Sequence, residues 1–223
     1  MTNKMTRIGG VDLQPKVYLA GPDVFLENPA PLDKAKKEIL EAFGLDGYVP
    51  TDNDLALSDS NASGQSIATA IARANFEMMG WCDSILAQLT PFRGPSADVG
   101  TVGELHYMYG LGKPVFAYSN DSRDYATRTA EDYYKGNVRH GHDEMFDQPA
   151  LYGDDGLFIE QYGQFDNLMI PFAITDSGGS MHVCDAPAET YYTDLTAFRA
   201  AARAAAVYFY GEEQIGRLDM RSQ

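Results

Sequence analysis

Short apolar runs alternate along this chain with longer segments whose apolar residues recur at helical spacing. The apolar runs predict buried strands, and they lie at residues 16–20, 84–89 and 113–118, with a weaker one at 48–50. The periodic segments predict helices, and they lie at residues 32–43, 65–79 and 194–210, with a further helix around Glu104. Strands that alternate with helices are typical of a parallel sheet covered on both faces. The pattern therefore predicts an α/β fold with a flavodoxin-like or Rossmann-like doubly wound parallel sheet and flanking helices.

No repeat and no linker divides the chain. Residues 1–15 form a polar N-terminal tail, and we expect residues 16–223 to form a single α/β domain. Residues 119–163 differ from the rest, because they are rich in Asp, Tyr, Arg and Gly and show little periodicity. A stretch of this length is often functional. We expect it to be a long insertion or a loop that covers the active site or joins a subunit contact.

Composition and charge narrow the choice of partner. The 223 residues are 44% hydrophobic, which is enough for a sizeable core, and the net charge is −15. An acidic surface argues against a nucleic-acid polymer as partner but leaves a neutral nucleoside or sugar open. No run approaches the roughly 18 apolar residues that span a membrane, and the polar N-terminus has no secretory core. A cytoplasmic protein without a membrane partner is expected.

The stretch from Ala97 to Leu105 carries the strongest chemical signal. It contains Asp98 and Glu104 around a glycine-punctuated turn that follows a predicted strand and opens a helix. Open α/β sheets bind ligands at the carboxyl ends of their strands. The positive end of a helix favours an ionised carboxylate there. A positioned carboxylate can attack an anomeric carbon.

Each of these residues also has an ordinary structural interpretation. Glu104 can be an exposed helix acid, although it shares a helical stripe with apolar residues and so is expected to face inward. Asp98 can be a helix N-cap, Asp83 a turn residue and Tyr18 a core tyrosine. Together, however, three acids and a tyrosine are expected at one edge of the sheet, and this combination favours a site.

Other motifs are weaker. Residues 140–143, with the sequence HGHD, can bind a metal or form a polar loop, and because no third ligand is indicated we expect no metal site. The turn at residues 21–25 lacks the glycines and the basic residue of a phosphate loop. The two cysteines, Cys82 and Cys184, have no metal-type spacing.

Four blocks in this order resemble the nucleoside 2-deoxyribosyltransferase family. They are YLAGPDVF at residues 18–25, CDSI at 82–85, DVGTVGE at 98–104 and DNLM at 166–169. The third block is the most specific of the four. The tail, residues 119–163 and the C-terminal extension lie outside the resemblance.

The resemblance implies roles for four residues. Glu104 corresponds to the nucleophile that takes the 2-deoxyribosyl group as a covalent ester, and Tyr18 to the hydroxyl that orients it. Asp83 and Asp98 correspond to acids that bind the base, with Asp98 the better candidate for protonating the departing nucleobase. No metal or organic cofactor is implied.

The resemblance also implies substrate contacts from other segments. Asn167 and Met169 correspond to a pair donated across a subunit interface, where Asn167 holds the sugar 5′-hydroxyl. Gly21, Asp23 and Phe25 fall in the block expected to bind substrate. A homo-oligomer is therefore expected, with each site completed by a neighbouring subunit and with nucleosides and nucleobases as its small-molecule partners.

The implied reaction exchanges 2-deoxyribose between purine and pyrimidine bases with net retention. An N-glycosidase that gives the same intermediate to water is the alternative, acting on a nucleoside or on a 2′-deoxynucleoside 5′-monophosphate. The acid Asp23 in the first turn favours unphosphorylated nucleosides, whereas Arg93 keeps the nucleotide open. A binding module without turnover is the third possibility, and the intact set of Tyr18, Asp98 and Glu104 argues against it.

Overall fold

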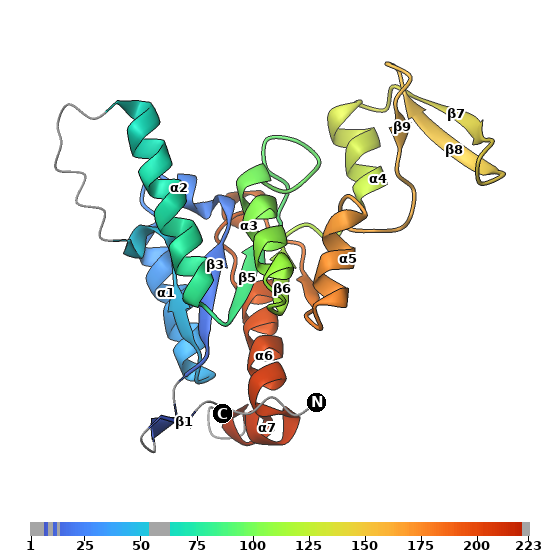
Figure 1. The fold of residues 1–223 in the computed structure, drawn as a ribbon. Helices are drawn as coiled ribbons and strands as arrows, with labels where there is room; N and C mark the ends of the chain where they lie inside the picture. The colour runs from blue at the N-terminus through green and yellow to red at the C-terminus, as the bar shows by residue number, and fades with distance from the viewer. Residues whose placement is uncertain (1–6, 9–10, 13, 54–62, 220–223) are drawn as a thin grey trace.

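The computed structural model of the chain describes residues 7–8, 11–12, 14–53 and 63–219 (Figure 1). At its centre is a five-stranded parallel sheet, as the alternation of strands and helices predicts. Its strands, in spatial order, are β10 (Met181–Val183), β6 (Val115–Ser119), β5 (Ser84–Gln88), β3 (Lys16–Ala20) and β4 (Asp46–Tyr48). The second strand to appear in this sheet along the chain is thus residues 46–48 rather than 48–50.

Helices cover both faces of the sheet, which confirms the doubly wound architecture. The longer helices are α1 (Ala30–Ala42), α2 (Gly64–Trp81), α3 (Val99–Gly110), α5 (Met169–Asp176), α6 (Thr196–Tyr210) and α7 (Glu212–Asp219). Short helical turns are η1 (Pro22–Phe25), η2 (Pro50–Asp52), α4 (Tyr125–Arg128), η3 (Thr129–Tyr133) and η4 (Ala188–Thr190). Two short strands in the expected tail, β1 (Arg7–Ile8) and β2 (Val11–Asp12), pair antiparallel, and most of residues 1–15 lie outside the described residues.

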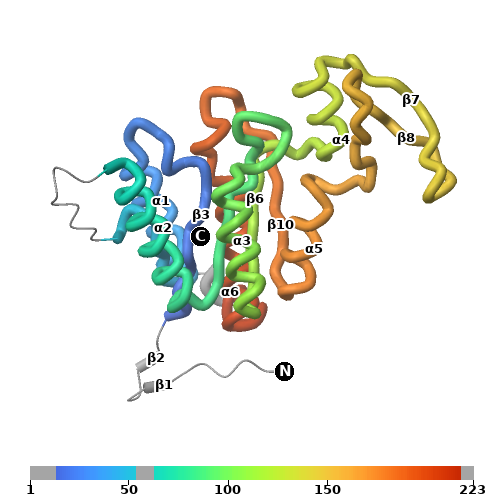
Figure 2. Tube along the Cα trace, turned by 45° about the horizontal axis from the view of Figure 1, so that its top comes forward, coloured from blue at the N-terminus to red at the C-terminus, as the bar shows by residue number. Residues whose placement is uncertain are grey.

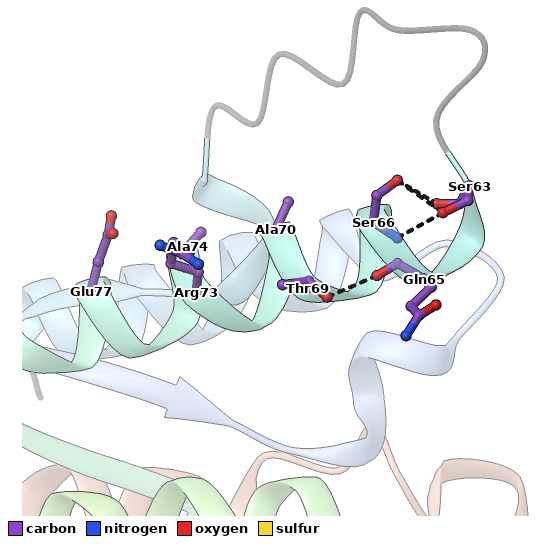
Figure 3. Close-up of a pocket in the computed structure, with 8 residues that line it drawn as sticks. All are labelled: Ser63, Gln65, Ser66, Thr69, Ala70, Arg73, Ala74 and Glu77. Carbon is purple, nitrogen blue, oxygen red and sulfur yellow. Dashed lines mark hydrogen bonds between the residues drawn. The ribbon is translucent and has the colours of Figure 1, made fainter.

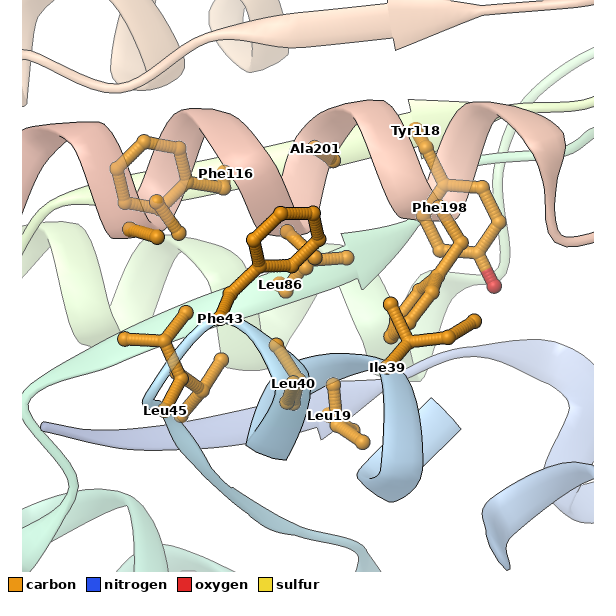
Figure 4. Packing of buried hydrophobic residues seen from close by; sticks show 14 of the residues in the cluster. Leu19, Ile39, Leu40, Phe43, Leu45, Leu86, Phe116, Tyr118, Phe198 and Ala201 are labelled. Atoms are coloured by element: carbon orange, nitrogen blue, oxygen red, sulfur yellow. The ribbon is translucent and has the colours of Figure 1, made fainter. Parts of the chain in front are cut away.

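Alternate residues of the strands feed two separate cores. Val17 packs with α1 and α6 on one face, as does Leu19 (Figure 4), whereas Tyr18 and Ala20 pack with α2, α3 and α5 on the other. The alanines of α6 let that helix approach the sheet closely. Because β5 and β6 are buried along their whole length, their sequences are continuous apolar runs rather than alternating ones.

Residues 119–163 contain regular structure that the sequence did not predict. After β6 the chain forms α4, η3 and a three-stranded antiparallel sheet of β7 (Val138–Asp143), β8 (Gln148–Gly153) and β9 (Phe158–Ile159). We call residues 125–163 the antiparallel arm; it stands off from the parallel sheet in both views (Figures 1 and 2). Most of β7 is exposed, so these strands are held by ladder hydrogen bonds without an alternating apolar pattern.

Within the described residues, none of the helices combines the length and the apolar character that a membrane crossing needs.

A buried ion pair fastens the turn after β3 to the helix that follows it. Lys36 Nζ of α1 lies 2.7 Å from Asp23 Oδ2 of η1, and both side chains are buried. Desolvating two charges is costly, and only their pairing offsets that cost. The ion pair therefore holds the turn in place, and removing either charge alone would leave the other buried and unpaired.

We expect Lys36→Met to lower the free energy of unfolding by about 3–5 kcal/mol, because it leaves the Asp23 carboxylate buried without its cation. Urea unfolding of the single variant and of Lys36→Met/Asp23→Asn measures the effect, and the double variant should recover much of the loss. A single variant within about 1 kcal/mol of wild type would show that the pair does not hold the turn.

Candidate active site

A pocket of about 490 Å³ opens at the carboxyl edge of the parallel sheet. The turn after β3, the turn after β4, the helix α2 and the first turns of α3 form its walls. Its lining residues are Gly21, Val24, Phe25, Pro50, Thr51, Asn53, Ile71, Asn75, Asp98, Gly100, Thr101 and Glu104. This is the edge at which open α/β sheets bind ligands.

Glu104 is held at the pocket by two side chains from other elements. Its Oε1 accepts a hydrogen bond of 2.7 Å from the Tyr18 hydroxyl of β3 and one of 3.4 Å from Asn75 Nδ2 of α2. Tyr18 is fully buried in the sheet, so its hydroxyl is a fixed donor. The carboxylate of Glu104 is therefore oriented before any ligand arrives.

The surroundings of Glu104 change its acidity. Burial raises the pKa of Glu104 from its ordinary 4.5 to about 7; the Tyr18 and Asn75 hydrogen bonds oppose this rise, and the negative charge of Asp98 adds to it. The positive end of a helix was expected to favour the ionised form, but Glu104 lies in the second turn of α3, and burial is the largest influence on its pKa. Burial, reinforced by Glu104, raises the pKa of Tyr18, so Tyr18 keeps its donor proton.

Asp98 both caps α3 and lines the pocket. Its Oδ2 accepts hydrogen bonds from the Thr101 amide at 2.9 Å and from the Thr101 hydroxyl at 3.1 Å. The N-cap interpretation of Asp98 is thus confirmed, and the cap is compatible with a place in the site. Capping also fixes the carboxylate relative to Glu104 on the same helix.

Asp83 lies at the opposite end of the sheet. It precedes β5 instead of following a strand, and its Oδ2 accepts a hydrogen bond of 2.8 Å from the Lys16 amide at the start of β3. The expectation that three acids share one edge is therefore wrong for Asp83. The sequence analysis correctly placed Asp83 next to a strand, but the structure shows it at the amino end of β5, whereas the pocket lies at the carboxyl ends of the strands.

The structure brings two amides into the pocket that the sequence analysis missed. Asn53 Nδ2 donates to Asn75 Oδ1 at 3.0 Å, and Asn75 in turn reaches Glu104. A signal for Asn75 was available, because it lies one helical turn before Met78 and Met79, the buried residues of α2. A polar residue on the buried stripe of a helix is a candidate for a site.

The first turn supplies backbone and an aromatic wall. A Cβ on Gly21 would lie 2.3 Å from Asp23 Oδ1 and 2.9 Å from Gln88 Cβ, so only glycine fits here. Phe25 lines the pocket and stacks on Phe92 with ring centroids 5.3 Å apart. The structure does not bring Asp23 to the pocket, because its carboxylate faces α1.

Arg93 covers the outer side of this aromatic pair. Its guanidinium lies 4.6 Å from the ring centroid of Phe92 and 5.4 Å from that of Phe25, outside the pocket lining. Its φ of 56° is in the left-handed region. The guanidinium of Arg93 thus makes cation–π contacts with Phe25 and Phe92 beside the pocket.

Asn167 and Met169 do not reach the pocket of their own chain. Asn167 Nδ2 donates to Glu160 Oε1 of the arm at 2.8 Å, and Met169 begins α5 with 54% of its surface exposed. The segment that carries them therefore lies at the surface. It is on the opposite side of α3 from α2, which forms a wall of the pocket (Figure 1).

Two other regions offer less. His142 of β7 contacts Asp147 at 3.0 Å, and no group of three histidine, cysteine or acidic side chains is placed to hold a metal in the part of the chain that the structure describes. A second hollow runs along the outer face of α2 (Figure 3). The hydroxyl groups that line this hollow bond to neighbouring residues at the start of α2. For example, Thr69 Oγ1 donates to the Gln65 carbonyl at 2.9 Å.

We expect Glu104→Gln to stabilise the protein more at pH 8 than at pH 4, by about 2–3 kcal/mol. The folded chain holds the Glu104 proton more tightly than the unfolded chain, so ionising this group costs stability as the pH rises from 4.5 to about 7. Urea unfolding at both pH values measures the difference, with Glu38→Gln, at an exposed position of α1, as the matched control. An equal effect of Glu104→Gln at both pH values would contradict the prediction.

Comparisons with known proteins identify the family of this chain. The family model of nucleoside 2-deoxyribosyltransferase matches residues 17–169. An uncharacterized protein of Schizosaccharomyces pombe is 32% identical over 185 residues, which cover 81% of this chain and 87% of that protein. The solved 2-deoxyribosyltransferase of Leishmania mexicana is 27% identical, with a TM-score of 0.52 over 80% of this chain and 94% of its own. The enzyme of the same name from Bacillus psychrosaccharolyticus is 28% identical, with a TM-score of 0.39 over 48% and 74%. The chain therefore belongs to the nucleoside 2-deoxyribosyltransferase family.

Proposed function

We propose that this protein transfers 2-deoxyribose between nucleobases through a covalent ester on Glu104. One observation carries the proposal: a half-buried carboxylate, oriented by the Tyr18 hydroxyl at 2.7 Å, lines a pocket at the carboxyl edge of the sheet together with Asp98. A nucleophile needs orientation as well as charge, and this carboxylate has both above pH 7.

In the first half of the reaction, the ionised Glu104 attacks C1′ of a 2′-deoxynucleoside. The bond between C1′ and the base nitrogen breaks, and Asp98, which is ionised in the free site and takes up a proton when the nucleoside binds, gives that proton to the departing base. The transition state resembles an oxocarbenium ion, which the nearby carboxylate stabilises and then traps as the ester. Tyr18 stays hydrogen-bonded to Glu104 and keeps the attacking oxygen aligned.

In the second half, a nitrogen of another base attacks C1′ from the side that the first base left. The ester bond breaks, Glu104 departs as a carboxylate, and Asp98 takes up the proton of the incoming base. Two inversions give net retention, and the two bases bind in turn. Asn53 and Asn75 offer both amide donors and acceptors toward the base edge, which suits bases of either class.

We also propose that the protein works as a homo-oligomer in which Asn167 and Met169 complete the site of a neighbouring subunit. Their own chain leaves them outside its pocket, and the start of α5 exposes Leu168, Met169 and Phe172. An apolar patch of this kind is typical of an interaction surface. A second subunit that covers it would bring the Asn167 amide to another chain's sugar.

We expect the purified protein to form a new 2′-deoxynucleoside from 2′-deoxyinosine and free cytosine or adenine, in amounts that depend on the added base. Chromatography of the products measures this, and mass spectrometry of protein treated with 2′-deoxyinosine alone should show one added 2-deoxyribosyl group. Glu104→Gln should lose both signals, because it removes the nucleophile. Glu38→Gln on the surface of α1 should keep both.

Three other outcomes would change the assignment. Release of hypoxanthine without a new nucleoside would make the protein an N-glycosidase, with water in place of the second base. Turnover confined to 2′-deoxynucleoside 5′-monophosphates would make the nucleotide its substrate. Binding of nucleosides without any bond cleavage would contradict an enzymatic role.

We expect a mixture of Glu104→Gln and Asn167→Ala proteins to regain activity that each lacks alone. For a dimer whose sites take Glu104 from one chain and Asn167 from the other, random exchange restores roughly a quarter of the sites. Activity after mixing and subunit exchange, with size-exclusion chromatography, measures the effect. A monomeric protein, or hybrids without activity, would contradict the shared site.

A further inference from the structure

A fully buried arginine anchors the antiparallel arm to the body of the protein. Arg128 is the last residue of α4, and its guanidinium donates to the carbonyl of Pro95 at 2.8 Å, to that of Arg123 at 2.7 Å and to that of Phe165. The same guanidinium lies 3.7 Å from Asp166 Oδ2. A cation without solvent contact is thus surrounded by acceptors from three segments of the chain.

Asp166 is equally buried and binds two segments that are far apart in the sequence. Its Oδ1 accepts hydrogen bonds from the Ser96 hydroxyl at 2.5 Å and from the backbone N–H of Asn167 at 2.8 Å. Its Oδ2 accepts one from the backbone N–H of Ala97 at 2.9 Å. Charge-assisted bonds of this kind are about twice as strong as neutral ones. One carboxylate therefore ties residues 96–97 to the start of the segment that carries Asn167.

The segment held in this way leads directly to Asp98. Beyond Asp98, the chain is fixed by the capping bonds of Oδ2 to Thr101 and by α3 itself. Before Asp98, the chain is fixed by the bonds from Ser96 and Ala97 to Asp166. The backbone on both sides of Asp98 is thus restrained, and one of the two restraints comes from outside the pocket.

We propose that Asp166, held in place by Arg128, is a positioning residue that aligns Asp98 with the departing base. This proposal rests on the proposed function, because it assigns the pair a part in the protonation by Asp98. It also gives the arm a role at its own chain's site, since Arg128 stands where the arm leaves the body. A misplacement of about 1 Å in a catalytic group can cost about 100-fold in rate.

Two substrates separate positioning from general support of the fold. 2′-Deoxyguanosine needs a proton on its departing base, whereas the base of 7-methyl-2′-deoxyguanosine is cationic and departs neutral without one. A residue that aligns Asp98 should matter for the first and little for the second. A residue that merely stabilises the fold should affect both alike.

The test is base release in a single turnover by the full chain with each substrate. We expect Asp166→Asn to slow release from 2′-deoxyguanosine roughly 10- to 100-fold more than release from the 7-methyl compound, because any displacement of the sugar contact at Asn167, which Asp166 also holds, slows both substrates alike. Ser96→Ala removes the hydrogen bond from Ser96 to Asp166. It should shift the ratio of the two rates in the same direction by a smaller factor. It also provides the test if Asp166→Asn does not fold.

Ser177→Ala is the matched control, since Ser177 Oγ accepts from the Val115 amide at 3.0 Å and donates to the Ile174 carbonyl at 2.7 Å, away from residues 95–98. It should leave the ratio of rates unchanged. Equal slowing of both substrates by Asp166→Asn and Ser96→Ala would overturn the positioning role. A wild-type protein that releases neither purine nor pyrimidine base would overturn the proposed function instead.

A pH profile gives a second readout with any 2′-deoxynucleoside that the protein cleaves. Glu104 is faced by Tyr18 from β3, Asn75 from α2 and Asp98 from the start of α3. If Asp166→Asn lets the negative charge of Asp98 move away, the rising limb that reports ionisation of Glu104 should move to lower pH. A rising limb that stays in place in both Asp166→Asn and Ser96→Ala would contradict the proposal.

Discussion

The hydrogen bond between the Tyr18 hydroxyl and Glu104 is the contact on which this site depends. It joins a central strand to a crossover helix, and the two residues are 86 positions apart in the sequence. It exists only when β3 lies beside β5 and α3 packs across the face that Tyr18 shares with Ala20. The apolar cores on both faces of the sheet therefore position a single oxygen atom. Their packing is part of the chemistry as well as of the stability.

The same burial sets a balance between reactivity and stability. Burial raises the pKa of Glu104 to about 7 and makes its ionised form costly, while the bonds from Tyr18 and Asn75 return part of that cost. A carboxylate that is poorly solvated is also a better nucleophile than one shielded by water. The site thus keeps a group that weakens the fold at neutral pH, as functional sites often do.

The sequence predicted what depends on local pattern and missed what depends on the path of the chain. The α/β fold and the place of Asp98 and Glu104 followed from continuous apolar runs and from a glycine-punctuated strand-to-helix turn. Asp83 was misplaced although it precedes β5 in the sequence, because it was grouped with residues that follow strands, and the two ends of a parallel strand lie at opposite edges of the sheet. Asn75 was missed because its partner Glu104 lies on another helix. The arm was missed because its exposed β7 is held by backbone pairing, which leaves no periodic signature.

Two buried cations show how a chain with a net charge of −15 fixes the walls of its pocket. Lys36 holds Asp23 and with it the turn of Gly21 and Phe25, and Arg128 holds Asp166. Neither cation enters the pocket. Well-packed apolar residues could stabilise both places at least as much, but they would not fix direction as charged hydrogen bonds do. This use of buried ion pairs explains why Asp23 and Asp166 face inward, away from the pocket, while Asp98 and Glu104 line it.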